Sequence, residues 1–401
     1  MTQTVKPVRF RSKIDTFFGV SFQIIVIVFS ARFIMDIGTR ILYPFIPQIS
    51  EGLGLTVVGF SWLIFIRSMV GISGPIFGLL SDRYGRRKLM ALGLFCQATG
   101  VMGVALSWQW WATLPMIFFG LGLAAFLPAQ QAYISDQVIY QKRGRALAAI
   151  EFSWAASAIF ILPLIGWMID KVSWYSPFLM LALLSLIGTL MVWFRLPPAE
   201  HHSHPSLSWS EIRAVCFRPS VLASITVSML LFVAVTTFIT IWGIWLTAGF
   251  GLSAATLGLV ATGIGVAELG GSSLSGLFID RLGKRRGSQL GLLCLAIIML
   301  LLPLTQNALF MAISLLIITG TCLEFTIVSL IPLYSEQVPE ARATVFALVF
   351  SGVGFGAALG TPITAILWEQ YGLWAVCAVA AVCVLIAYNI LGKFVHEVSP
   401  N

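Results

Sequence analysis

Charge is the scarcest property of this sequence: Asp, Glu, Lys and Arg together make up 10% of its 401 residues, whereas 58% are hydrophobic. Soluble domains carry roughly 25% charged residues, so a soluble fold would leave far too much apolar surface in water. We therefore expect lipid to surround most of the chain. In lipid the backbone has to satisfy its own hydrogen bonds, which allows only helices or a closed barrel. Long continuous apolar runs favour helices.

Signals of catalysis and cofactor binding are also missing. The six cysteines are scattered, without the spacing of a metal site. No Gly-x-x-x-x-Gly-Lys-[Ser/Thr] loop is present, which argues against an ATP-driven machine within this chain. His201, His202 and His204 could bind a metal, but a solvated linker explains their polar, proline-containing surroundings better. We expect no enzyme, no cofactor and no metal.

One charged stretch occurs twice. Gly78–Lys88 reads Gly-Leu-Leu-Ser-Asp-Arg-Tyr-Gly-Arg-Arg-Lys, and Gly276–Arg286 reads Gly-Leu-Phe-Ile-Asp-Arg-Leu-Gly-Lys-Arg-Arg. A generic basic loop would explain the charges but not the repeated Gly and Asp positions. The repetition therefore predicts a chain of two similar halves. We place the first half at residues 1–195, a linker at 196–218 and the second half at 219–401.

Apolar runs predict twelve membrane-spanning helices, six in each half. The fold class is therefore an all-α membrane protein of two pseudo-symmetric six-helix bundles. A further short helix on the surface is expected in the linker, at 208–216. The twelve spans are expected at residues 17–49, 56–80, 87–108, 111–138, 145–169, 174–195, 219–247, 254–279, 287–305, 308–335, 343–368 and 372–394.

Positive charge follows alternate loops. Apart from Lys171 and the intrahelical Arg32, Arg40 and Arg67, all of the 24 Lys and Arg lie at the termini, in the linker or in one set of alternate loops. This positive-inside pattern places both termini in the cytoplasm. We expect a protein of the cell (inner, cytoplasmic) membrane that does not bind nucleic acid, although its net charge is +8.

Several stretches carry a family resemblance. The repeated stretch resembles the signature between helices 2 and 3 of the major facilitator superfamily, with its weaker echo between helices 8 and 9. Gly38–Pro47 resembles the helix 1 motif of twelve-helix drug:proton antiporters, and Pro163–Gly166 keeps part of their helix 5 motif. Ala132–Asp136 and Lys142–Ala146 resemble the family's helix 4–5 loop. Met116 departs from the pattern, because antiporters of this kind have an arginine there that is thought to act in proton coupling.

The resemblance implies alternating access of the two bundles, with a substrate site between them. Asp82 is then expected near the N-terminus of the helix at 343–368, where the helix dipole favours a carboxylate, and Asp280 near that of the helix at 145–169. The cytoplasmic gate would comprise Gly78, Asp82, Arg83, Gly85, Arg86, Arg87, Asp136, Arg143, Arg145, Asp280, Arg281, Gly283, Lys284, Glu336 and Arg342. The helix-packing motifs would comprise Pro44, Pro47, Pro163, Gly166, Gly356, Gly360 and Pro362.

Ionisable residues within the expected helices are the candidates for transport chemistry. Each costs roughly 3 kcal/mol or more at mid-depth, so it usually faces a polar cavity. Arg32, Asp36 and Arg40 are spaced by four residues and therefore lie on one helical face, where the acid can pair with either arginine. Glu268 and Glu324 have no evident partner and are expected to exchange protons. Six such residues stand out, Arg32, Asp36, Arg40, Arg67, Glu268 and Glu324, and the cavity is expected to include Tyr43, Trp242 and Trp245.

Two interpretations of these charges remain open. In the first, Asp36 neutralises the arginines and the cluster only holds helices 1 and 2 together. In the second, which we favour, the arginines form an anion-preferring wall that faces a proton-binding wall with Glu268 and Glu324. Of the two glutamates, Glu324 is the stronger candidate, because small residues after Glu268 favour close helix packing there.

The sequence therefore predicts a secondary transporter, with a lipid bilayer and a small-molecule substrate as its partners. We expect a monomer that exports a small organic solute, powered by the proton gradient. The alternatives are proton-coupled uptake of an anionic metabolite, lipid-linked export, and a membrane sensor that keeps the fold without transporting.

Overall fold

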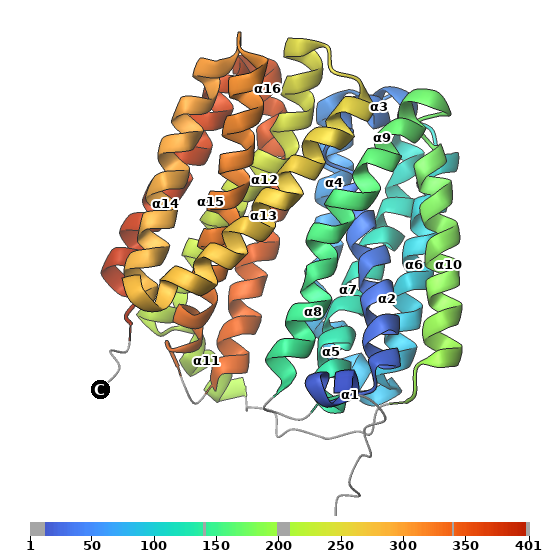
Figure 1. Ribbon diagram of the computed structural model, residues 1–401, viewed down its shortest axis with the longest axis vertical. Coiled ribbons are helices and arrows are strands. Elements are labelled where there is room, and N and C mark those ends of the chain that lie inside the picture. The colour runs from blue at the N-terminus through green and yellow to red at the C-terminus, as the bar shows by residue number, and fades with distance from the viewer. Residues whose placement is uncertain (1–12, 139–141, 199–208, 339–340, 398–401) are drawn as a thin grey trace, which may run out of the picture.

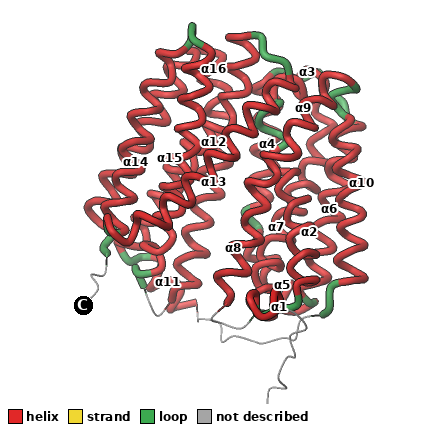
Figure 2. Tube along the Cα trace, in the orientation of Figure 1, coloured by secondary structure: helices red, strands yellow, loops and turns green. Residues whose placement is uncertain are grey.

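A computed structural model describes residues 13–138, 142–198, 209–338 and 341–397, and these are almost entirely helical (Figure 2). Ten helices belong to the first half of the chain: α1 Lys13–Phe18, α2 Phe22–Arg40, α3 Ile46–Leu53, α4 Val57–Gly71, α5 Gly74–Tyr84, α6 Arg86–Leu106, α7 Thr113–Gln137, α8 Arg143–Ala156, α9 Leu162–Lys171 and α10 Ser176–Arg195. Six follow: α11 Trp209–Cys216, α12 Pro219–Phe250, α13 Ala254–Leu282, α14 Lys284–Leu301, α15 Leu309–Ser335 and α16 Arg342–Phe394. Short 3-10 turns occupy Gln109–Ala112 and Leu302–Thr305, and a π-helical turn occupies Ser157–Ile161.

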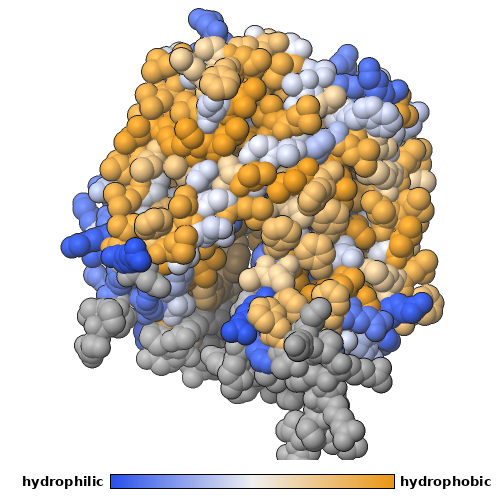
Figure 3. Space-filling model, viewed as in Figure 1, coloured by the Kyte–Doolittle hydropathy of each residue, from blue (hydrophilic) through white to orange (hydrophobic). Residues whose placement is uncertain are grey.

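The described helices account for twelve spans. Ten helical segments are long and apolar enough to cross a membrane, and the longest of them, in α16, is two spans that turn at Gly372, whose φ is +72°. The twelfth span is shared between α4 and α5, which are separated at Ile72 and Ser73. Apolar side chains cover much of the outer face of the molecule (Figure 3), as expected for a surface that contacts lipid. The predicted fold class is confirmed.

Two expected helices are divided by breaks. The expected span at 17–49 is α1, α2 and α3, with turns between α2 and α3 around Pro44. The span at 56–80 breaks just before Pro75, at the start of α5. A proline lacks the backbone N–H and restricts the preceding residue, which explains the breaks at Pro44 and Pro75. The break between α1 and α2 falls instead at Gly19, whose φ is +73°. The linker helix expected at 208–216 is confirmed as α11.

The repeated charged stretch forms the same turn in both halves. Gly85 precedes α6 with φ +101°, and Gly283 precedes α14 with φ +83°. Residues with a side chain rarely adopt this backbone conformation, which explains why both copies keep a glycine at that position. The predicted pseudo-symmetry thus extends to the backbone of these loops.

Contacts between the two bundles gather at one end of the molecule. We call the end that holds α1 and α11 the linker end, and the opposite end, near α3 and α9, the far end (Figure 1). The bundles meet where α13 packs along α9, where α16 packs along α4, and where α12 contacts α3. Their ribbons diverge toward the linker end (Figure 1), where the space-filling view shows a recess between them (Figure 3).

Candidate functional site

An ion pair joins the two bundles at the centre of the molecule. Arg40, the last residue of α2, contacts the carboxylate of Glu268 in α13 through both terminal guanidinium nitrogens. Both side chains are buried, with 10% and 12% of their surface exposed. The guanidinium carbon also lies 4.0 Å from the ring centroid of Trp154 in α8. The expectation of an unpaired Glu268 is therefore wrong, because the chain break after Arg40 brings it to the other bundle.

This pair lies in the wall of a central cavity. The cavity volume is about 30 Å³, which accommodates a water molecule or two, so a solute has to separate the ion pair or the bundles to enter. Of the aromatic residues expected here, Tyr43 and Trp242 line the cavity. Trp245 does not, because its ring packs edge-on against Phe250 with centroids 5.9 Å apart. The lining residues are Arg40, Tyr43, Pro44, Trp154, Leu162, Phe238, Ile239, Trp242, Ala261, Ile264 and Glu268.

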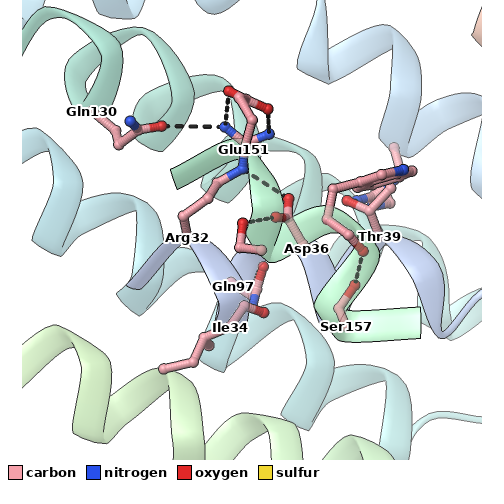
Figure 4. A network of polar contacts seen from close by, with 11 residues as sticks. Arg32, Ile34, Asp36, Thr39, Gln97, Gln130, Glu151 and Ser157 are labelled. Atoms are coloured by element: carbon pink, nitrogen blue, oxygen red, sulfur yellow. Dashed lines mark hydrogen bonds and ion pairs between the residues drawn. The ribbon is translucent and has the colours of Figure 1, made fainter. Parts of the chain in front are cut away.

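A second cluster of charges lies within the first bundle. Arg32 of α2 donates from Nε to Asp36, 2.8 Å away, and from both terminal nitrogens to Glu151 of α8, 3.1 Å each (Figure 4). It also contacts the amide oxygen of Gln130 in α7 at 3.2 Å. The second oxygen of Asp36 accepts from the hydroxyl of Ser153 at 2.5 Å. The cluster therefore links helices α2, α7 and α8.

Two features of this cluster were not specified from the sequence. Asp36 pairs with Arg32 and not with Arg40, which Glu268 already neutralises. Glu151 was missed altogether, although a carboxylate within the apolar run at 145–169 was a signal of the same kind as the other six. Its side chain is 48% exposed, so part of the Arg32 site lies at the accessible surface of the protein.

Arg67 of α4 has no carboxylate within ion-pair distance among the described residues. Its residue surface is 2% exposed. One terminal nitrogen donates to the hydroxyl of Thr39 at 2.9 Å, and the guanidinium carbon lies 4.3 Å from the centre of the Phe119 ring. Its Nε has no hydrogen-bond acceptor in the described part of the chain. A buried cation in this state is costly unless a partner compensates it.

Glu324 of α15 is a carboxylate without a cation partner among the described residues, whereas Arg67 is a cation without an acid. Within the described residues it forms no ion pair, and its charged neighbours are Glu268, Arg40 and Glu151. Glu268 is already paired with Arg40. The central region therefore combines two neutralised arginines, one unpaired guanidinium on the first bundle and one unpaired carboxylate on the second.

Five of the gate residues that the structure describes form ion pairs, each within its own bundle. Arg86 contacts both Asp82 and Asp136, and the Nε–Oδ2 distance to Asp136 is 3.2 Å. In the second bundle, Lys284 contacts Glu336. Asp82 therefore has a partner on its own loop, one helical turn away. Its expected place near the N-terminus of α16 stays a prediction.

The other basic gate residues also contact their own half. Arg87 donates to the carbonyl of Leu196 at 3.1 Å, and Arg143 donates to that of Val138 at 3.1 Å. The guanidinium carbon of Arg145 lies 5.1 Å from the ring centre of Phe17, and that of Arg83 lies 5.5 Å from Tyr84. Arg281 is exposed. The side chains of Asp280 and Arg342, and all of His201, His202 and His204, lie outside the described residues.

The far end contains an interbundle contact that sequence reasoning missed. The carboxylate of Asp170, near the end of α9, accepts hydrogen bonds from the backbone N–H groups of Ala254 at 3.0 Å and Ala255 at 2.8 Å, at the start of α13. The backbones approach closely here: a Cβ atom on Gly166 would lie 2.2 Å from the Ala254 carbonyl oxygen. Gly166 therefore lies at a close contact between the two bundles.

The remaining motif residues lie at close backbone contacts, in a turn, near helix starts or within a helix. Pro44 lies in the turns between α2 and α3, and its carbonyl oxygen is 2.2 Å from where a Cβ of Gly243 would stand. Within the second bundle, a Cβ on Gly356 would lie 2.2 Å from the carbonyl oxygen of Met229, and one on Gly360 would lie 2.8 Å from Thr236. The three other prolines are within or at the start of helices: Pro47 in α3, Pro163 in α9 and Pro362 in α16.

These features define a polytopic helical membrane protein with a polar centre between two six-helix bundles. The sequence profile of the Major Facilitator Superfamily matches residues 28–244 and 225–400, and the chain belongs to that family. It is therefore a membrane transporter and not an enzyme.

Known proteins similar to this chain agree with that assignment. It is 24% identical to the MFS-type transporter YwfA of Bacillus subtilis, over 89% of this chain and 88% of YwfA. It is 23% identical to a multi-drug resistance efflux pump PmrA homolog of Lactococcus lactis, over 89% and 90%. The crystal structure of a D-xylose–proton symporter has the same fold, with a TM-score of 0.77, 15% identity, and coverage of 94% of this chain and 98% of the symporter.

Proposed function

We propose that this protein exports a small organic solute in exchange for protons, and that Glu324 binds the proton. The observation that carries the proposal is the position of Glu324: a carboxylate without a cation partner among the described residues, beside the ion pair that joins the two bundles. Unpaired acids within membrane spans commonly mark proton pathways.

The Arg40–Glu268 pair is the element that solute binding has to disturb. The pair lies in the wall of the central cavity and joins the two bundles, so in this proposal the pair separates when the solute enters. The released Glu268 then lies beside Glu324. Electrostatic coupling between these two neighbouring acids provides a physical route by which solute occupancy changes proton binding.

Export is favoured by a relative and by the helix motifs. The PmrA homolog of Lactococcus lactis, which matches this chain over most of its length, is named as a multi-drug resistance efflux pump. The stretches Gly38–Pro47 and Pro163–Gly166 resemble motifs of drug:proton antiporters. In this proposal the linker end faces the cytoplasm, as the positive charges predict, and the recess at that end receives the solute.

Transport by everted membrane vesicles tests the proposal. Vesicles containing the full chain are energised and supplied in turn with ethidium, fluorescein and radiolabelled benzoate. We expect accumulation of at least one of them that collapses when a protonophore dissipates the pH gradient, and loss of uphill accumulation in Glu324→Gln. The control is Glu369→Gln, which neutralises an exposed glutamate of α16. Accumulation that survives the protonophore would contradict proton coupling, and absence of any flux would favour the sensor.

A second candidate, proton-coupled uptake of an organic anion, is supported by the unpaired Arg67. The two candidates differ in the direction of net flux under an imposed pH gradient. Right-side-out vesicles, acidified outside, accumulate the solute if uptake is the physiological direction.

A further inference from the structure

Among the residues that the structure describes, Arg67 differs from Arg32 and Arg40 in having no acid as a partner. Arg32 contacts two carboxylates, and Arg40 contacts Glu268. Arg67 is more deeply buried than either, at 2% exposure against 8% and 9%. Its recorded partners are a neutral hydroxyl and the face of a phenyl ring. The most buried guanidinium is thus the least compensated one.

A purely structural role does not account for this arrangement. One guanidinium N–H of Arg67 donates to the hydroxyl of Thr39. The uncharged amide of a glutamine at position 67 could make the same hydrogen bond. The Nε donor has no acceptor within the described residues, so burial there costs free energy that no described contact recovers. An anion is the partner that compensates both the charge and the missing hydrogen bond, since carboxylate and phosphate oxygens match the guanidinium fork.

The surroundings of Arg67 connect it with the central cavity. Tyr43, which lines that cavity together with Arg40, is the electrostatic neighbour of Arg67. The cavity also has two tryptophan side chains in its wall, Trp154 from α8 and Trp242 from α12. Aromatic walls suit an apolar or aromatic body. Arg40, which is in that wall, and Arg67, the neighbour of Tyr43, suit a negatively charged head group.

We propose that the transported solute is an organic anion with an apolar body, whose charged group is recognised by Arg67 and competes with Glu268 for Arg40. This inference rests on the proposed function only in assigning the central cavity to the solute. It holds for export and for uptake alike. It also explains why the first bundle keeps an uncompensated cation, because the solute supplies the missing charge.

Binding to the purified full-length chain in detergent tests the proposal without any proton gradient. Thermal stability is measured with benzoate, 2-naphthoate and phenylphosphonate, each compared with a neutral or cationic analogue: benzamide, 2-naphthamide and benzylammonium. We expect the anions to raise the unfolding temperature and the analogues to leave it unchanged. If no anion stabilises the protein more than its analogue, the proposal is wrong.

Variants at Arg67 then locate the effect. In Arg67→Gln we expect the apparent affinity for the stabilising anion to fall by about tenfold or more, the usual consequence of losing a charge-assisted contact, with a smaller loss in Arg67→Lys. Arg195→Gln, which removes an exposed arginine at the end of α10, is the matched control. Unchanged affinity in both Arg67 variants would overturn the assignment. If Arg67→Gln does not fold, the Arg67→Lys affinity and the selectivity of the wild type decide.

A Glu324→Gln variant separates this proposal from the preceding one. Anion binding that persists in Glu324→Gln while uphill transport is lost supports both. Anion binding together with transport that ignores the proton gradient supports the organic-anion substrate and refutes proton coupling. Proton-coupled transport of ethidium alone, without anion binding, refutes the organic-anion substrate and leaves proton coupling intact.

Discussion

The carboxylate of Asp170, on the first bundle, caps α13 of the second bundle by accepting hydrogen bonds from the N–H groups of Ala254 and Ala255. Ser253 accepts from the N–H of Thr256 at the same helix end. Three of the four N–H groups that a helix leaves unsatisfied at its start are thus paired, two of them across the interface. The helix dipole favours the negative charge of Asp170 there, so this contact stabilises the far end in its closed form.

Removing the Asp170 carboxylate should open the far end more often. We expect Asp170→Ala to increase the reaction of an impermeant maleimide with Ala261→Cys, applied from the far side in a background whose native cysteines are replaced. Ala261 lines the central cavity and becomes accessible from that side only when the bundles separate there. An increase of about threefold to tenfold corresponds to the loss of one or two hydrogen bonds to a charged group in an exposed setting. Asp170→Asn, which keeps one acceptor oxygen, should lie between.

The repeat supplies the control for this experiment. Glu369 follows Pro362 at the interval by which Asp170 follows Pro163. Its side chain is exposed, and it has no hydrogen bond to the first bundle among the described contacts. Glu369→Ala should leave the labelling unchanged. Equal labelling of the Asp170 and Glu369 variants would show that the cap does not hold the far end closed.

Contacts between residues near in sequence were predictable, and contacts between the bundles were not. The spacing of four predicted that Asp36 can pair with Arg32 or Arg40, and it pairs with Arg32. The repeated Gly-Asp-Arg-Gly stretch predicted matching loops. Arg40 and Glu268 are 228 positions apart, and their pairing depends on where α2 ends and how the two bundles pack. No periodicity within one helix carries that information. The Asp170 cap was missed for the same reason, because the carboxylate oxygens of Asp170 accept hydrogen bonds from a helix of the other half.

The ion pair between Arg40 and Glu268 predicts a difference between stability and transport. Each single neutralisation, Arg40→Gln or Glu268→Gln, leaves a buried charge alone, and we expect a loss of about 3–5 kcal/mol in stability. The double neutral variant should recover most of the unfolding temperature, because neither member of the pair is left as an uncompensated charge, but not transport, because Arg40 no longer binds the solute. Detergent-solubilised unfolding temperatures and vesicle flux measure the two effects. Recovery of transport in the double variant would show that the pair has only a structural role.

Glu324 predicts a separation of solute exchange from proton coupling. In Glu324→Gln we expect solute counterflow, in which labelled solute exchanges with unlabelled solute without a gradient, to continue at a rate independent of pH. Counterflow in the wild type should change with pH, because proton binding at Glu324 alters the charge beside Glu268 and Arg40. A Glu324→Gln protein that keeps the wild-type pH dependence would place the proton at another group. Parallel measurements on Glu369→Gln exclude a general effect of losing a glutamate.

The Arg32 cluster predicts an order of stability among its acids. Asp36 is 3% exposed, holds Arg32 through a 2.8 Å contact and accepts from Ser153, so Asp36→Ala breaks a buried network and should cost about 3–5 kcal/mol. Glu151 makes two bonds to the same guanidinium, but its side chain is 48% exposed, and solvent screening should reduce the cost of Glu151→Gln to about 1 kcal/mol or less. Unfolding temperatures in detergent give the order directly. If Glu151→Gln is the more destabilising variant, the exposed carboxylate and not Asp36 is the principal partner of Arg32.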